Sequence, residues 1–458
     1  MMNAEALSGA GDLARRDRPL EGLRVVELGS LIAGPFATRI MAEFGAEVIK
    51  VERPGIGDPL RTWRYVDPRT KTSLWWALQS RNKKLVTLNV GHPEGLDIAK
   101  RLAAETDIVV ENFKPGTLEK LGLGWDVLHE LNPRLILVRV SGYGQTGPYK
   151  DRPGFANIGE AMGGIRYVTG EPGRAPVRSG ISLGDSLASL YAVIGALMAV
   201  HARDVRGTGE GQVVDVALYE AVFNLMESMV PEFDVAGIVR ERTGSSLPGI
   251  TPSNTYCAKD GSYVAIGGNS DAIFKRLMRA IGRPELGDDP RYATNADRTE
   301  HADELDSLIE NWVEGRPTGE IMRILADADV PVGPIYTVRH RKGRAVRSPR
   351  HAYGRRYRRR WVRQDAGPGP EALRDARRGR VARRHIGVAQ RGCVRRAAWA
   401  LHRGDRASSR GGGDLMVPPT FFEIVEAGAF ARSRSAPLSR YRGPSSAAAR
   451  DGRYDTLF

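Results

Sequence analysis

Residues 23–52 read LRVVELGSLIAGPFATRIMAEFGAEVIKVE, and this stretch decides the fold class. The β-branched run at 23–28 predicts a strand, Pro35 opens an amphipathic helix that ends before Gly45, and 47–52 predict a second strand. A strand, a helix and a strand in this order form a βαβ unit, which pairs the two strands in parallel. The stretch therefore predicts an α/β fold with a largely parallel sheet.

The alternation continues outward from this unit. We predict a large domain over residues 19–236, after an N-terminal extension at 1–18. Its further elements are strands at 85–90, 107–112, 135–140 and 213–217, a helix at 93–105, a long apolar helix at 185–203, and another helix that follows the last strand and ends at about 229. Short strands near 256 and at 263–266, with helices at 272–281, 302–314 and 318–328, predict a smaller α+β domain over 237–338.

Basic residues are concentrated after this second domain. The chain has 458 residues and a net charge of +14, but residues 339–458 hold 30 of the 68 Lys and Arg and only 9 of the 54 Asp and Glu. Leu, Ile, Val and Phe make up 18 of those 120 residues, too few to bury a core. We expect a disordered Arg-rich tail, or a segment translated in a shifted reading frame of a GC-rich gene.

Composition excludes several classes of protein. Cys257 and Cys393 are the only cysteines, so a disulfide framework is excluded and a reducing compartment is indicated. The sequence contains no HExxH, CxxC or GxSxG motif, so we expect no metal and no serine hydrolase chemistry. No export signal and no apolar run of about 20 residues is present, which favours a cytoplasmic protein without a membrane span.

Two motifs have both a functional and a structural interpretation. The glycines of 29–34 (GSLIAG) follow a strand and open a helix, where a nucleotide phosphate can bind, but the spacing is not GxGxxG and a plain turn is favoured. Asp185 begins the long apolar helix. From spacing alone it is a helix cap, whereas a carboxylate at the edge of the core could also attack a carbonyl group.

Several longer motifs together resemble the class III CoA-transferases, a family that includes formyl-CoA transferase and succinyl-CoA transferases and is related to α-methylacyl-CoA racemase. The resemblance covers about residues 19–338. It is carried by the segments LEGLRVVELGSLIAGPFATRIMAEFGAEVIKVERPGIGDPLR (20–61), VVENFKPGTLEKLGLG (109–124), SGYGQTGPY (141–149), RSGISLGDSLASLYAVIGALMA (178–199) and GTGEGQVVDVAL (207–218).

The resemblance implies a Rossmann-like large domain, a small domain and an interlocked homodimer. It implies that Asp185 is the nucleophile, that acyl-CoA and a carboxylic acid are the substrates, and that no cofactor is bound permanently. Gly267 and Gly268 resemble the family's mobile glycine loop, which would donate to oxyanions, although a strand-end turn explains them equally simply. The positions that match the family's CoA site are Arg53, Leu88, Asn89, Asn112, Phe113, Lys114 and Lys120.

The chain also departs from the family pattern. Ile32 stands where formyl-CoA transferases have a catalytic Gln, and Phe155, followed by Ala156, stands where the racemases have a His-Asp pair. No segment that returns to the large domain is recognisable after Val338. We therefore expect CoA transfer, with succinyl-CoA as the donor suggested by GISLGDS at 180–186. The alternatives are an α-methylacyl-CoA racemase, or an inactive chain whose basic tail binds nucleic acid; the tail's few aromatics make nucleic acid an unlikely partner.

Overall fold

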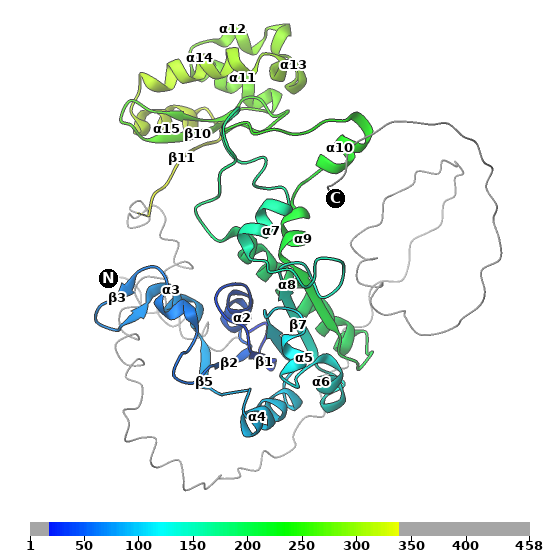
Figure 1. Cartoon of the computed structure of the whole chain (residues 1–458). Coiled ribbons are helices and arrows are strands. Elements are labelled where there is room, and N and C mark those ends of the chain that lie inside the picture. The colour runs from blue at the N-terminus through cyan, green and yellow to red at the C-terminus, as the bar shows by residue number, and fades with distance from the viewer. Residues whose placement is uncertain (1–17, 339–458) are drawn as a thin grey trace, which may run out of the picture. The chain divides into compact units, whose positions relative to one another are not determined.

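The computed structural model describes residues 18–338. Residues 1–17 and 339–458 lie outside the described residues, and with them lie nearly all of the predicted N-terminal extension and the whole Arg-rich tail. The described chain alternates strands and helices and forms a large parallel sheet followed by a smaller antiparallel one (Figure 1). The predicted α/β class is confirmed.

The first sheet is the framework of the predicted large domain. Its strands are β1 (Arg24–Glu27), β2 (Glu47–Glu52), β5 (Lys83–Thr87), β6 (Ile108–Glu111), β7 (Ile136–Ser141) and β8 (Val213–Ala217). They lie in the order β5-β2-β1-β6-β7-β8, and every neighbouring pair is parallel. This is the Rossmann order, in which the connections turn in opposite directions on either side of the first strand. Ligands of such sheets bind at the carboxyl ends of the strands beside that point.

Helices cover both faces of this sheet. The helices of this part of the chain are α2 (Ala33–Glu43), α4 (Pro93–Ala104), α5 (Thr117–Lys120), α6 (Trp125–Leu131), α7 (Ala156–Met162), α8 (Leu183–Val200), α9 (Leu218–Phe223) and α10 (Met229–Ala236), with a short π-helical turn η3 (His201–Val205) after α8. Helix α10 buries none of its residues. Val25 faces the core that contains α2 and α8, while its neighbour Val26 faces the core that contains α4 and α6. The alternation of adjacent strand residues thus produces three layers.

Helix α8 packs against α2 and the sheet through small residues. Ala188, Ala192, Ala196 and Ala199 are at most 1% exposed and follow one face of the helix. A Cβ atom at Gly195 would lie 2.5 Å from Val214 of β8, so glycine is required for this close approach. Residues 183–205 are long and apolar enough to cross a membrane by length and composition, but this buried alanine face makes α8 a core helix.

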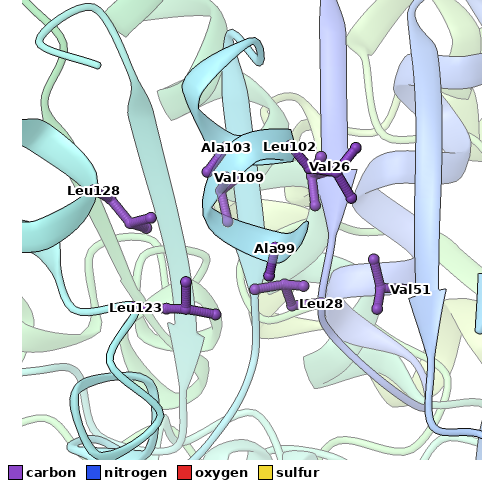
Figure 2. A pocket seen from close by; sticks show the side chains of 9 residues that line it. All are labelled: Val26, Leu28, Val51, Ala99, Leu102, Ala103, Val109, Leu123 and Leu128. Carbon is purple, nitrogen blue, oxygen red and sulfur yellow. The ribbon is translucent and has the colours of Figure 1, made fainter. Parts of the chain in front are cut away.

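A small apolar cavity lies under α4. Figure 2 shows the nine side chains that line it, and every one of them is aliphatic; they are Val26, Leu28, Val51, Ala99, Leu102, Ala103, Val109, Leu123 and Leu128. An empty space with no polar lining offers nothing to orient a polar ligand. We assign it to imperfect packing of the core.

The second sheet has three antiparallel strands in the order β11-β10-β9. The strands are β9 (Ser253–Cys257), β10 (Tyr263–Gly267) and β11 (Val332–Pro334), and the helices are α11 (Asp271–Ala280), α12 (Pro284–Gly287), α13 (Asn295–Glu300), α14 (Ala302–Glu314) and α15 (Thr318–Asp327), with a short turn η4 (Pro290–Tyr292). Their apolar faces form a separate core around Phe274 and Ile309. The predicted α+β character of residues 237–338 agrees with these elements, while the boundary itself stays a prediction.

Some elements differ from those predicted. The strand predicted at 85–90 begins two residues earlier and ends at Thr87, and the helix predicted to about 229 ends at Phe223. The segment between β2 and β5 was not predicted at all. It contains a short turn η2 (Pro59–Thr62), a hairpin of β3 (Val66–Asp67) and β4 (Thr72–Ser73), and helix α3 (Leu74–Gln79). Its two-residue strands are too short to give a periodic signal.

Candidate active site

Asp185 lies in the first turn of α8, close to the positive end of the helix dipole. The residue that precedes the helix is Ser182, and no side chain caps the helix through a hydrogen bond. The cap interpretation of Asp185 is therefore not what the structure shows. Its side-chain carboxylate accepts no hydrogen bond from any other group of residues 18–338, so its oxygens are available to react.

The surroundings of Asp185 raise its pKa. Burial is the larger cause and the negative charge of Glu160 the second; Arg178 opposes them, and the result is a pKa of about 6 against an ordinary value of 3.8. Asp185 is thus ionised at pH 7 but less stabilised than a carboxylate in water. A destabilised anion without hydrogen bonds is a good nucleophile toward a carbonyl carbon.

The carboxylate of Glu160 lies near Asp185, and unlike Asp185 it accepts several hydrogen bonds. It is 2% exposed and accepts hydrogen bonds from the guanidinium groups of Arg166 (3.0 Å) and Arg178 (3.1 Å). It also accepts a bond from the backbone N–H of Gly184, at 3.2 Å. Glu160 therefore ties α7 to the residue that precedes the candidate nucleophile. Sequence reasoning missed Glu160, because an acidic residue in a short helix carries no signal of its own.

Gly184 explains why a glycine precedes the acid. A Cβ atom at this position would lie 3.0 Å from the carbonyl oxygen of Ala156 and 3.3 Å from Cγ of Glu160. Glycine thus allows α7 and α8 to approach and brings the start of α7 beside Asp185. Phe155 precedes α7 and is 70% exposed. It has no group that can accept or release a proton.

A buried charge cluster supports the loop between β1 and α2. The amine of Lys50 lies 2.7 Å from Glu27 and 2.9 Å from Asp58, and all three side chains are at most 1% exposed. Burial alone would raise the pKa of Glu27, but the charges of Lys83 and Lys50 outweigh it and hold this pKa below its usual range. Charged residues inside predicted buried strands were the available signal for this cluster.

The same loop is fixed from its other side by Asn112. The amide oxygen of Asn112 accepts from the backbone N–H of Ser30 at 2.8 Å, and its amide nitrogen donates to the carbonyl of Ser30 at 2.9 Å. Asp58 accepts from the N–H of Leu31, which has the left-handed φ of 64°. These N–H groups are occupied and do not point at a phosphate, which favours the plain turn over nucleotide binding at 29–34.

The residues that match the family's CoA site all follow carboxyl ends of parallel strands. Arg53 follows β2, and the remaining positions follow β5 and β6; they are Leu88, Asn89, Asn112, Phe113, Lys114 and Lys120. Arg53, Lys114 and Lys120 are exposed, and none of them forms an ion pair with another residue of the described chain. Cations on one sheet edge suit the phosphates of CoA. Their role as a CoA site stays a prediction.

Gly267 and Gly268 lie at the end of β10, in the second sheet's domain. The backbone N–H of Gly267 donates to the carbonyl of Pro331 at 3.0 Å, and that of Gly268 donates to the carbonyl of Pro252 at 2.8 Å. Both amides are therefore used within their own domain. An oxyanion role for them stays a prediction and requires these two hydrogen bonds to break.

A groove with a mostly apolar lining lies beside the start of α8, and sequence reasoning did not identify the residues that line it. Its residues are Ile32, Phe36, Arg39, Arg64, Trp75, Gln79, Gly180, Ile181, Ser182 and Ser186. Ser182 and Ser186 stand on either side of Asp185 in the sequence. Within residues 18–338, no three His, Cys, Asp or Glu side chains are grouped as a metal site would require.

Known proteins match most of the described chain. Residues 20–351 match the sequence profile of CoA-transferase family III. The chain is 53% identical over 325 residues to a succinyl-CoA–D-citramalate CoA-transferase of Chloroflexus aurantiacus, covering 71% of this chain and 80% of that protein. It is 44% identical over 340 residues to the beta subunit of a succinyl-CoA–L-malate CoA-transferase of the same bacterium, covering 74% and 82%.

A human relative and a crystal structure extend these similarities. The succinyl-CoA:glutarate CoA-transferase of Homo sapiens is 34% identical over 323 residues, covering 70% of this chain and 73% of that protein. The crystal structure of a CaiB/BaiF family protein from Brucella suis superposes with a TM-score of 0.64 at 35% identity, covering 71% of this chain and 86% of that one.

Proposed function

This chain belongs to CoA-transferase family III, and we propose that it moves CoA from succinyl-CoA to a carboxylic acid through a thioester on Asp185. The observation that carries the proposal is the carboxylate of Asp185, which is partly buried, ionised at pH 7 and free of hydrogen bonds within the described chain. A carboxylate whose only task was structural would be hydrogen-bonded.

The chemistry needs no proton transfer, because each attacking group is already an anion. The carboxylate of Asp185 attacks the thioester carbonyl, which gives a mixed anhydride and releases CoA thiolate. The thiolate attacks the Asp185 carbonyl, so that the anhydride C–O bond breaks, succinate leaves and Asp185 carries CoA as a thioester. The acceptor carboxylate then attacks this thioester, and the same two steps in reverse yield the new acyl-CoA and free Asp185.

The acceptor that we propose is a short hydroxydicarboxylic acid. The relatives at 53% and 44% identity are described as acting on D-citramalate and L-malate, which both carry two carboxylates and a hydroxyl group. The α-methylacyl-CoA racemase alternative has less support, since Phe155 supplies no acid or base where that reaction needs one. Coenzyme A enters as part of the substrate rather than as a resident cofactor.

Trapping the intermediate tests this proposal. The wild-type protein is incubated with succinyl-CoA, quenched in acid and digested, and the peptide that contains Asp185 is examined by mass spectrometry. We expect CoA on this peptide, and we expect its loss when malate or citramalate is added. The matched control is Asp151→Asn, which changes an exposed carboxylate and should still form the adduct. A wild-type protein that turns over without any adduct at Asp185 would overturn the mechanism.

We further propose that the enzyme is a cytoplasmic homodimer. Helix α8 exposes an apolar stripe opposite its alanine face, with Leu190 and Ile194 each 44% exposed and Met198 51% exposed. A stripe of this kind suits a protein–protein contact, and a second copy is the partner that the family resemblance implies. Sedimentation analysis should give twice the chain mass, and Ile194→Glu should shift it toward the monomer; a monomeric wild type would contradict the proposal.

Residues 339–458 lie outside the described residues, and for them the proposal concerns the gene. The family match ends at 351, and the Arg, Ala, Gly and Pro that dominate the segment are encoded by GC-rich codons. We propose that the segment is read in a shifted frame and that the purified chain has reduced activity. The coding DNA tests this, because another frame downstream of Val338 should encode a sequence similar to the relatives; three frames without such a sequence would refute the shift.

A further inference from the structure

The groove beside Asp185 has the size and the lining of a small-molecule site. It has a volume of about 390 Å³, within the range of such sites. Three segments far apart in the sequence build it: α2 and the residue before it, the β3–β4 hairpin region with α3, and residues 180–186 at the start of α8. Ser182 and Ser186 line it and are three positions and one position from Asp185 in the chain, so a molecule in the groove lies close to the proposed nucleophile.

Two guanidinium groups, those of Arg39 and Arg64, line the groove. The guanidinium of Arg39 lies 4.4 Å from the centre of the Phe36 ring and 3.4 Å from the carboxylate of Glu43. The carboxylate of Glu43 also pairs with Arg81. Arg64 lies at the rim, 5.5 Å from the centre of the Trp75 ring, and pairs with no carboxylate of residues 18–338. These cations favour an anionic occupant.

Gln79 adds an unsatisfied acceptor to this charge. Gln79 is 3% exposed, and its side-chain oxygen accepts no hydrogen bond within the described structure. Buried polar atoms are nearly always paired in a protein with its ligands in place. The missing partner is a hydrogen-bond donor, and a hydroxyl group on a small ligand meets this need.

We propose that this groove binds the part of the acid remote from the reacting carbon: Arg39 and Arg64 hold the distal carboxylate, and the Gln79 oxygen accepts from the hydroxyl of the acceptor. The inference rests on the proposed CoA transfer and names its substrate class, a short dicarboxylic acid with a hydroxyl group as acceptor. The donor acyl group and the acceptor occupy the groove in turn, since both react at Asp185. No bond is made or broken in the groove.

Two pairs of substrates separate the two contacts. Butyryl-CoA carries a methyl group where succinyl-CoA carries its distal carboxylate, and succinate lacks the hydroxyl of malate. We expect the wild-type kcat/KM to be about 10- to 100-fold higher for succinyl-CoA than for butyryl-CoA, the effect of one charged hydrogen-bonded contact. Arg64→Ala and Arg39→Gln should each reduce this ratio about tenfold or more. Gln79→Leu should instead reduce the preference for malate over succinate.

The control variant is Arg69→Ala, which lies in the same hairpin region, is 86% exposed and pairs with Asp67 outside the groove. It should leave both ratios unchanged. Arg39 forms an ion pair with Glu43, so its replacement can also disturb folding. The exposed Arg64 therefore provides the decisive measurement. Thermal unfolding is recorded for each variant. The ratios of the kcat/KM values are compared rather than the rates themselves, because a general loss of activity would lower the kcat/KM values of both substrates alike.

Failure of this inference can be distinguished from failure of the proposed function. If the wild type forms no CoA adduct on Asp185, the proposed transfer is wrong. If the adduct forms but succinyl-CoA is not preferred, or the preference is unchanged in Arg64→Ala and Arg39→Gln, the groove does not bind the distal carboxylate. If the malate preference is unchanged in Gln79→Leu, the hydroxyl contact is wrong.

Discussion

The first sheet's domain contains two groups of carboxylates that are shielded from water, and they differ in their ion pairs and hydrogen bonds. Under the loop between β1 and α2, Glu27 and Asp58 meet Lys50 at 2.7 and 2.9 Å, and backbone N–H groups complete the cluster. At the start of α8, Asp185 is partly buried, yet its carboxylate accepts no hydrogen bond in the described structure. The charge state is the same in both groups; the pairing differs.

This difference separates support from reactivity. A buried carboxylate that is paired and hydrogen-bonded holds its neighbours in place, and it has little tendency to attack anything. A carboxylate left without donors keeps its nucleophilicity at a cost in folding free energy. Glu160 stands between the two cases, because it is paired with Arg166 and Arg178 and still acts on Asp185 through its charge.

Replacing the unpaired carboxylate should give the largest effect. Asp185→Asn removes the proposed nucleophile, so turnover should fall at least about 10³-fold. The fold should become more stable at pH 7, by about 3 kcal/mol, because the pKa of Asp185 is raised to about 6 from 3.8 and its ionised form therefore destabilises the native state. Steady-state kinetics and urea unfolding measure the two changes.

The sign of the stability change depends on pH. The native state binds the Asp185 proton more tightly than the unfolded state, so the cost of ionisation is complete above about pH 6 and disappears as the pH falls toward 4. The stability difference between wild type and Asp185→Asn should shrink over this interval. A variant that is less stable than the wild type at pH 7 would show that Asp185 is a supporting residue.

Breaking the paired cluster should mainly affect stability. Lys50→Met leaves Glu27 and Asp58 buried without their shared cation, and we expect a loss of about 3–5 kcal/mol in the free energy of unfolding. The matched control is Lys84→Met, whose amine is exposed and pairs with Glu47 at the surface, with an expected change below about 1 kcal/mol. Equal losses in the two variants would remove the distinction between buried and exposed pairs.

Replacing Glu160 should change the pH dependence of CoA loading on Asp185. Glu160→Gln removes the negative charge that raises the pKa of Asp185, so this pKa should fall. The rate of CoA loading requires ionised Asp185, so it should rise through about pH 6 in the wild type and at a lower pH in the variant. Loading rates from pH 4.5 to 8 measure the shift. An unchanged acid limb would mean that burial alone sets this pKa.

We expect the smallest effects for Asn112 and Lys114 at the sheet edge, where one replacement should change stability and the other CoA binding. Asn112→Ala loses both hydrogen bonds to Ser30 and should lower the free energy of unfolding by about 1–2 kcal/mol. Lys114→Ala removes an exposed cation and should instead weaken CoA binding a few-fold, more at low salt than at high salt. Calorimetry of CoA binding at two salt concentrations tests this. A stability loss for Lys114→Ala without weaker binding would contradict the assignment.

Sequence periodicity predicted the sheet because its strands are buried, apolar and separated by regular helices. The strands at 23–28 and 47–52 were found within one residue or so, and Asp185 was identified as a candidate from its place at the start of an apolar helix. The family resemblance then favoured the interpretation of Asp185 as a nucleophile over its interpretation as a helix cap. Nothing local distinguished these two, since both uses place an acid in the first turn.

The parts that could not be predicted depend on contacts between distant segments. Arg39, Arg64 and Gln79 line one groove although they come from two elements and a turn, and each is an ordinary polar residue in its own segment. The same holds for the pairing of Asn112 with Ser30, 82 positions earlier in the chain. Only the tertiary structure shows which polar groups find partners and which are left without one.

The groove draws Arg64, Trp75 and Gln79 from the segment between β2 and β5, a stretch that contributes no strand to the first sheet. Asp185, in contrast, stands on a helix that is locked to the sheet by four buried alanines. Two of the three side chains proposed to contact the acid, Arg64 and Gln79, are therefore encoded apart from the proposed nucleophile. Exchange of residues 59–79 between related enzymes could change which acid is accepted while the nucleophile stays where it is, which offers evolution, or an engineer, a simple route to new acceptors.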